Sequence, residues 1–372
     1  MTLISKSLKG ATIPHFYKSR LPWPTGAAYP TFVSQRRTGP SARCLSSSQE
    51  ESDDFGRYSV ILPEEPFVWG VSHITPRTVP DDIPRPVYAQ NRGPAQQTPS
   101  TSSISANTNG KATNEDDHQE PYKGDGRIQL SIDEETKLRA SAKLASKVRR
   151  FAGNLVRPGV TTNAIDAAIH DFILSHRAYP SPLLYSGFPR SCCTSINNIV
   201  SHGIPDDRPL EDGDIVNIDV TVYLDGYHGD TSQTFLVGDV DPQGRDLVRF
   251  TNAALEAGIT ACGPGRPFKG IGQAIHNLIR HSPYSVCTAF AGHGIGRVFH
   301  RPPWIHHSMN DEPGMMLPGH CFTIEPCIVQ GSRPQVWIFP DGWTASTENC
   351  ARSAQAEHMV LITESGADVL TL

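Results

Sequence analysis

Acidic residues are missing from the start of this chain. The first 49 of its 372 residues contain no Asp or Glu, although Lys, Arg, Ser and Thr are frequent there. Long apolar runs are missing as well: no stretch approaches the roughly 18 consecutive apolar residues of a membrane-spanning helix. A large net charge is also absent, since the formal value is only −5. This gives no electrostatic reason to expect a nucleic-acid-binding protein.

Cysteine is scarce for the length of the chain. Eight cysteines are too few to hold 372 residues together as a disulfide scaffold. No Cys-x-x-Cys pair occurs, and a vicinal pair, Cys192-Cys193, is present instead. These features argue against a zinc ribbon built on thiolates and favour a reducing compartment.

The basic N-terminus predicts targeting to an organelle. An acid-free segment rich in basic and hydroxyl residues is typical of a transit peptide, and residues 1–48 are interpreted as one. Arg43-Cys44-Leu45, followed by three serines, resembles a matrix-processing site. We expect a mitochondrial protein in preference to a plastid or cytoplasmic one. The alternative is a disordered basic tail.

Composition divides the rest of the chain in two. Residues 49–120 are rich in Pro, Ser, Thr and Asn without an amphipathic period, which predicts an extension and a disordered linker. Deleting residues 1–110 is therefore expected to leave the folded part intact. A folded domain is predicted for residues 121–372, with a first helix that opens at Ser131 and ends at Pro158-Gly159.

One hairpin organises this domain. Asp225-Gly226 separates two apolar, β-branched arms, and a type I′ turn there places Thr221 opposite Asp230. Asp219 then faces Ser232, so the two aspartates are diagonal neighbours, roughly 7–8 Å apart or less at Cβ. Two such carboxylates repel each other unless a divalent metal lies between them. The other interpretation is a solvated pair on an edge hairpin, and the hairpin alone leaves both open.

A pattern of helix and strand residues recurs at a constant offset of 106 positions. It matches Pro158-Gly159 with Pro264-Gly265, residues 168–170 with 274–276, Gly213 with Gly319, and Asp219 with Glu325. A constant offset across helix and strand makes coincidence a poor explanation. The chain is therefore predicted to be an α/β (α+β) domain of two similar halves, too few for a solenoid. Matching strands that each carry a carboxylate predict one site shared between the halves.

Four further stretches carry candidate metal ligands or catalytic groups: residues 202–205, 292–300, 322–326 and 353–362. Each alone is weak evidence, because single His and Glu residues are usually hydrogen-bonded or solvated. Together with the hairpin, they resemble the type I methionine aminopeptidases, of the organellar kind with an N-terminal extension. The resemblance covers about residues 125–372, and residues 58–88 resemble the short extension of the organellar members. It implies the pseudo-two-fold pita-bread fold, with an antiparallel sheet covered by helices, which agrees with the repeat.

The resemblance also implies a metal site and a methionine pocket. The implied metal ligands are Asp219, Asp230, His293, Glu325 and Glu357, which suit two divalent ions such as Co²⁺, Mn²⁺, Fe²⁺ or Zn²⁺. The implied catalytic residues are His202, His300 and Glu325: the histidines hydrogen-bond the substrate and the glutamate moves a proton. The implied pocket residues are Tyr185, Phe188, Cys193, Phe299 and Trp343, for which the alternative is ordinary core. Thr221 is expected to orient water beside the metals.

The implied activity is removal of the initiator methionine from nascent or imported proteins whose second residue is small. It proceeds by attack of a metal-activated hydroxide on the first peptide bond. Protein N-termini are the expected partners; nucleic acid and membranes are not, and a monomer is expected. Two alternatives stay open: a proline-specific aminopeptidase or prolidase on the same fold, and a binding protein that has lost catalysis. The first would carry a folded N-terminal domain, and the second would lack ligands.

Three positions depart from the family pattern. Ser201 stands where the family usually has cysteine, Asn198 where it has glutamate, and Ala356 where it has an aromatic residue. None removes a ligand, but Ala356 is expected to loosen packing near Glu357. The zinc-binding extension of the cytosolic type I enzymes is missing, which speaks against docking on the ribosome through such a module.

Overall fold

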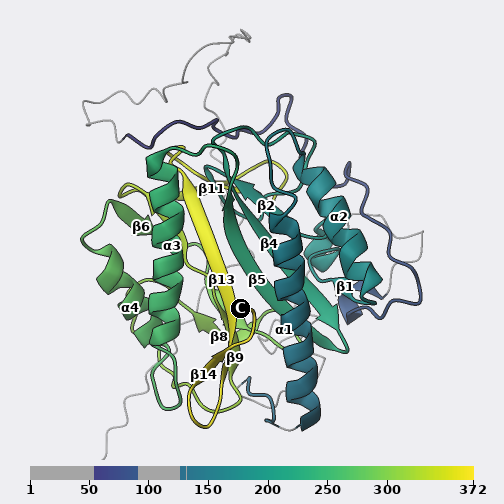
Figure 1. Ribbon diagram of the computed structural model, residues 1–372, viewed down its shortest axis with the longest axis vertical. Helices are drawn as coiled ribbons and strands as arrows, with labels where there is room; N and C mark the ends of the chain where they lie inside the picture. Colours follow the sequence, from purple (N-terminus) through teal and green to yellow (C-terminus); the bar gives the residue numbers. More distant parts are fainter. Residues whose placement is uncertain (1–53, 91–125, 131) are drawn as a thin grey trace, which may run out of the picture. The chain divides into compact units, whose positions relative to one another are not determined.

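The structure is a computed structural model that describes residues 54–90, 126–130 and 132–372 (Figure 1). The predicted transit peptide, its processing site at Arg43-Cys44-Leu45, the predicted linker beyond residue 90 and Ser131 lie outside the described residues. The domain boundaries predicted at residues 48 and 120 lie there too and stay predictions. Among the residues described, no helix is long and apolar enough to cross a membrane.

Side-chain caps begin two of the helices described. The helices are α1 (Ile132–Gly153), α2 (Thr162–Ser175), α3 (Pro242–Thr260) and α4 (Lys269–Ile279), with short 3-10 turns at η1 (Val87–Ala89) and η3 (Tyr185–Gly187). The Thr161 hydroxyl accepts from the Ala164 N–H at the start of α2. The Asp241 carboxylate does the same for Gly244 in α3, where Pro242 occupies the first helical position. Such caps satisfy N–H groups that have no partner within the helix.

An antiparallel sheet forms the centre of the domain (Figure 1). Its main path is β1-β4-β5-β13-β9-β7-β8, made of β1 (Tyr179–Pro180), β4 (Ile215–Leu224), β5 (Tyr227–Leu236), β13 (Ser353–Ile362), β9 (Cys321–Ile324), β7 (Gly292–Gly294) and β8 (Arg301–Ile305). The same sheet also contains strands that pair off this path: β2 (Cys193–Ile196), β6 (Tyr284–Val286), β10 (Cys327–Gln330) and β14 (Ala367–Val369). A small second sheet contains β11 (Val336–Ile338), β12 (Ala345–Thr347) and β3 (Ile199–Ser201). Helix α1 packs on β4 and β5, and α3 packs on β13, so helices cover the sheet as predicted (Figure 1).

The predicted hairpin is confirmed in its register. Both central residues of the turn at positions 225–226 have positive φ, 52° and 89°, as a type I′ turn requires. The pairing of β4 with β5 places Asp219 opposite Ser232 and Thr221 opposite Asp230. Turn chemistry in the sequence therefore fixed which side chains share a face.

The predicted repeat is visible in the backbone hydrogen bonds of two matching loops. In the first half, the Gly159 N–H donates to the Leu210 carbonyl at 2.8 Å, and in the second the Gly265 N–H donates to the Met316 carbonyl at 2.7 Å. Both glycines have positive φ, 84° and 76°. Helices α1 and α2 thus correspond to α3 and α4. Because β13 pairs with β5 of the first half and with β9 of the second, the two halves share one sheet.

The extension belongs to the folded domain. Ile83 and Ala89 are buried in one apolar cluster with Tyr179 and Leu183 of the folded domain. Residues 54–90 therefore contribute to a core, contrary to the reason given for expecting residues 1–110 to be dispensable; the effect of the deletion itself stays a prediction. Residues 54–90 are anchored at irregular intervals by tertiary contacts, so they show no helical or strand period in the sequence.

Candidate active site

Five predicted ligands come from neighbouring strands of the sheet. They are Asp219 on β4, Asp230 on β5, His293 on β7, Glu325 directly after β9, and Glu357 on β13. One ligand atom each from Asp230, His293 and Glu357 lies within 4.8 Å of the others. The Nε2 atom of His293 is 3.6 Å from a carboxylate oxygen of Asp230 and 3.6 Å from one of Glu325. The shared sheet therefore gathers carboxylates from both halves around one imidazole.

The four carboxylates repel one another. Burial raises the pKa of Asp219 to about 7, and burial with the Asp219 charge raises the pKa of Glu325 to about 8. The pKa values of Asp230 and Glu357 are raised well above their ordinary range, by burial first and then by repulsion from the other carboxylates. Such a cluster is stable when ionised only if a cation neutralises it. The donor set of oxygens and one imidazole nitrogen fits a divalent metal.

Hydroxyl and amide groups hold two of these carboxylates in place. The Thr221 hydroxyl donates to Asp230 at 2.8 Å, and the Thr323 hydroxyl donates to Glu325 at 2.8 Å. The Gln355 amide donates to the other Glu325 oxygen at 3.2 Å. Thr221 was expected at the site, whereas Thr323 and Gln355 were missed. The strand period of two could have found both, because each lies two residues before a predicted ligand.

Two further supporting residues were missed. The Glu325 N–H donates to Nε2 of His307 at 3.0 Å, and burial lowers the pKa of His307 to about 3, which keeps this nitrogen an acceptor. From α1, the buried Arg149 guanidinium donates to the Thr231 hydroxyl at 2.7 Å, and that hydroxyl donates to the Glu357 carbonyl at 2.8 Å. No signal in the sequence pointed to His307. The sequence did carry a signal for Arg149, because this charged residue interrupts the apolar face of α1.

The two predicted substrate histidines lie beside the ligands. The His300 ring lies 4.2 Å from the His293 ring, centroid to centroid, and no hydrogen-bond partner of its buried Nδ1 atom occurs in the described part of the chain. Burial lowers the pKa of His202 to about 4. Burial first, and then the neighbouring His293 and His202, hold the pKa of His300 well below its ordinary value. Both rings are therefore neutral at pH 7, and each can offer one N–H donor and one acceptor.

The predicted pocket residues form two groups, one beside each histidine. Tyr185 and Phe299 contact each other at 4.9 Å between ring centroids, and both contact His300. Phe188 meets the Trp343 ring edge-on at 5.1 Å, and Trp343 lies edge-on to His202 at 6.1 Å. Cys193 pairs with Asp219 in the β2–β4 register, so its thiol shares the face of that ligand.

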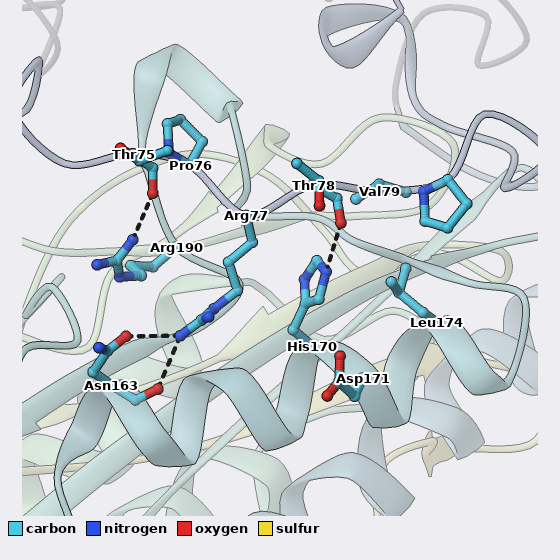
Figure 2. Close-up of a pocket in the computed structure, with 11 residues that line it drawn as sticks. Thr75, Pro76, Arg77, Thr78, Val79, Asn163, His170, Asp171, Leu174 and Arg190 are labelled. Atoms are coloured by element: carbon cyan, nitrogen blue, oxygen red, sulfur yellow. Dashed lines mark hydrogen bonds between the residues drawn. The ribbon is translucent and has the colours of Figure 1, made fainter.

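A separate cavity of about 680 Å³ lies between residues 75–80 and α2 (Figure 2). Several of its polar groups are paired with one another: Arg77 donates to Asn163, Arg190 donates to the Thr75 carbonyl, and His170 lies 3.0 Å from the Thr78 carbonyl (Figure 2). None of the predicted site residues lines it. This cavity is therefore an anchoring region of the extension rather than the candidate active site.

The departures from the family pattern have structural settings. The Asn198 amide donates to the Ile61 carbonyl at 2.9 Å and accepts from the Ile61 N–H at 2.7 Å, which fastens the extension. Ala356 packs in the apolar core of the second half. It neighbours Glu357 in a strand, so the two side chains point to opposite faces. Ser201 is buried and pairs with Ala345 of β12. None of the three faces the ligand cluster as a replacement for a ligand.

Comparisons with known proteins agree with this geometry. Residues 136–364 match metallopeptidase family M24. Methionine aminopeptidase 1D, chloroplastic/mitochondrial, of Arabidopsis thaliana is 54% identical over 235 residues, which cover 63% of this chain and 67% of that protein. The human protein named methionine aminopeptidase 1D, mitochondrial, is 51% identical over 234 residues, covering 63% of this chain and 70% of its own. A crystal structure of methionine aminopeptidase from Rickettsia prowazekii is 43% identical with a TM-score of 0.64, and covers 66% of this chain and all of that one.

Proposed function

Because the chain belongs to the methionine aminopeptidases of metallopeptidase family M24, we propose that it removes the initiator methionine from proteins of the mitochondrion. The pita-bread fold predicted from the resemblance is that of its relatives. The observation that best supports the activity is the convergence of Asp230, His293 and Glu357 within 4.8 Å. A binding protein that had lost catalysis would not retain such a cluster.

The metal requirement follows from the charge of the cluster. Asp219, Asp230, His293, Glu325 and Glu357 would hold two divalent ions, drawn from Co²⁺, Mn²⁺, Fe²⁺ and Zn²⁺. Metal ions bound there supply an acidified water and polarise the scissile carbonyl. The two-ion count rests on the donor set, since four carboxylates can neutralise four positive charges. Family membership itself supports the use of divalent metal.

The residues around the cluster then act on the substrate. The neutral imidazoles of His202 and His300 would donate to the scissile amide and to the developing oxyanion, which stabilises charge in the transition state. Glu325 would carry a proton between water and the leaving amine, since its carboxyl is held by hydrogen bonds on both oxygens. The pocket of Tyr185, Phe188, Cys193, Phe299 and Trp343 would hold the methionine side chain, a flexible thioether that packs well on aromatic rings.

The mitochondrial location rests on two independent lines. The first 49 residues lack acidic residues, as transit peptides do. The names of the human, zebrafish and mouse relatives, methionine aminopeptidase 1D, all carry the word mitochondrial, and the Arabidopsis relative is named chloroplastic/mitochondrial. A fluorescent fusion of residues 1–60 should therefore enter mitochondria, and a cytosolic fusion would contradict the assignment.

A peptide panel tests the activity. Purified protein loaded with Mn²⁺ or Co²⁺ should cleave Met-Ala-Ser, while Met-Lys-Ser, Ala-Ala-Ser and formyl-Met-Ala-Ser should react far more slowly. A large second residue crowds the site, alanine leaves the pocket empty, and formylation removes the amine that anchors the substrate. Comparable rates on all four peptides, or faster cleavage of an Xaa-Pro peptide, would contradict the proposal.

A further inference from the structure

The extension contacts the surroundings of the candidate methionine pocket at two points. Residues 75–80 run along α2, where the described contacts include Arg77 with Asn163 and Thr78 with His170 (Figure 2). The extension then ends its described part at η1, next to Tyr185 and His228. The second point lies next to Tyr185 of the candidate methionine pocket, whereas the first is linked to the pocket through Asp166 and the segment before Cys193.

At the first point, Arg77 forms an ion pair with the buried carboxylate of Asp166. Its Nη2 atom donates to the carbonyl and the side-chain oxygen of Asn163 at 2.9 and 2.7 Å, and its Nε atom donates to Asp166. The Asp166 side chain is 0% exposed. Its other oxygen accepts from the backbone N–H groups of Ser191 and Cys192 at 2.7 and 3.1 Å. The extension thereby helps to fix the segment that directly precedes Cys193 of the pocket.

At the second point, Tyr88 supports the pocket aromatics. Its ring meets Tyr185 edge-on at 5.1 Å and an interplanar angle of 79°, and its hydroxyl donates to the Ser181 carbonyl at 2.6 Å. It also lies over His228 at 6.5 Å, and His228 stacks on Phe299 at 5.2 Å. Tyr88 therefore contacts Tyr185 directly and Phe299 through the ring of His228.

We propose that the extension completes the methionine pocket, with Tyr88 as a positioning residue that holds Tyr185 and Phe299 for the substrate side chain. A ring packed on both sides loses rotational freedom before the substrate binds, so less is lost on binding. Tyr185 packs on Phe299, His300 and Tyr88, so removing Tyr88 takes away one of the rings that hold it. This inference rests on the proposed function, because it concerns the pocket of that reaction.

The test compares variants of the full chain on Met-Ala-Ser. Tyr88→Ala should raise KM roughly five- to tenfold with kcat changed by less than about threefold, because it weakens binding rather than the chemical step. It should also lower the ratio of kcat/KM for Met-Ala-Ser over Leu-Ala-Ser, since a looser pocket discriminates less. Tyr88→Phe keeps the ring and should retain the wild-type KM. Arg77→Lys keeps the charge but loses the two-point contact with Asn163 and should raise KM as well.

Asp82→Ala is the matched control. Asp82 also joins the extension to the domain, through an exposed ion pair with Arg177, but contacts no pocket residue among those described. Its kinetics should stay within about twofold of the wild type. If Tyr88→Ala gives no cooperative thermal transition, Tyr88→Leu, which keeps apolar bulk, should show the same rise in KM.

The outcomes separate this inference from the proposed function. Wild-type protein without activity on Met-Ala-Ser overturns the proposed function and this inference with it. An active wild type with an unchanged KM in folded Tyr88→Ala and Tyr88→Leu overturns the inference alone. So does an equal effect of Asp82→Ala, because the extension would then act only as a tether.

Discussion

Glu325 is held on three sides, which suits a residue that moves a proton. Thr323 and Gln355 donate to its two carboxylate oxygens, and its backbone N–H donates to His307. Burial raises the pKa of Glu325 to about 8. The hydrogen bonds fix its position, as the proposed role in proton transfer requires.

We therefore predict that substituting His307 lowers activity, although no contact with the substrate is assigned to it. His307→Ala removes the acceptor of the Glu325 N–H and should lower kcat/KM about 10- to 100-fold, the usual range for residues that orient a metal ligand. His307→Gln keeps an acceptor and should recover part of the loss. His306→Ala is the neighbouring control and should stay within about twofold. Steady-state kinetics on Met-Ala-Ser, with metal content measured in parallel, decides the matter, and an unaffected His307→Ala would refute the role.

Residues of the site were predictable where a local pattern placed them. The turn at positions 225–226 predicts that Asp219 and Asp230 share a face, and the repeat matches Asp219 with Glu325. The assignment of all five residues as metal ligands came from the resemblance to the family. The partner of His307 is 18 positions away along the chain, and that of Arg149 is 82 positions away. Only the folded sheet brings such pairs together, so neither role could be derived from spacing.

At the scale of elements, β5 and α1 approach each other closely. A Cβ atom on Gly229 would lie 2.5 Å from the backbone carbonyl group of Ser141. The Ser141 hydroxyl donates to the Tyr227 carbonyl at 3.0 Å, so helix and strand are also joined by a hydrogen bond. Glycine is needed here because it lets two backbones touch, next to the ligand Asp230.

Gly229→Ala should therefore displace β5 and destabilise the fold by about 1–3 kcal/mol, as overpacking does. Because Asp230 follows directly, metal affinity should weaken too. Gly366→Ala is the control, since a Cβ there meets nothing within 4 Å. Urea unfolding measures the stabilities, and calorimetric titration with Mn²⁺ measures the affinities. A Gly229→Ala protein as stable as Gly366→Ala would show that α1 shifts without cost.

The elements differ in how far the sequence determines them. The β4–β5 register was predictable because a two-residue turn admits one alignment of its arms. The packing of the extension on the domain was not predictable from its composition. Its contacts, made by Arg77 and Tyr88 and by Asn198 of the domain, are spaced at irregular intervals. A segment anchored in this irregular way has the composition of a disordered linker.

At the scale of the molecule, the two halves explain why one site forms. Equivalent strands carry Asp219 and Glu325, and β13 between β5 and β9 adds Glu357. The constant offset predicted this duplication. It could not predict the small sheet of β11, β12 and β3, because these strands belong to no repeated unit. In that sheet β3 ends directly before His202 and β12 begins shortly after Trp343, so the sheet holds the chain on which both residues lie.

The buried groups of the metal-free protein respond to pH in two opposing ways. Burial lowers the pKa of His202 and His293 to about 4. The folded state then binds fewer protons than the unfolded state, and stability falls as the pH drops below about 6.5. Burial raises the pKa of Asp219 to about 7 and of Glu325 to about 8. Here the folded state binds more protons, so stability falls as the pH rises from about 4 to 8.

Between about pH 6.5 and pH 8 the carboxylate effect outweighs the histidine effect. An unfolded histidine with a pKa of about 6.5 has at most half a proton left to lose there, whereas the carboxyls of Asp219 and Glu325 titrate across this window. The Tm of chelated protein should fall across this window. Protein loaded with Mn²⁺ should lose less, because bound cations keep the carboxylates ionised within the fold, so the gain in Tm from metal should grow with pH. Calorimetric scans at both pH values, with and without chelator, measure this. Asp219→Asn with Glu325→Gln removes the two titrating groups, and the chelated double variant should show a smaller fall. A chelated wild type whose Tm stays constant or rises would mean that these carboxylates do not repel one another in the folded state.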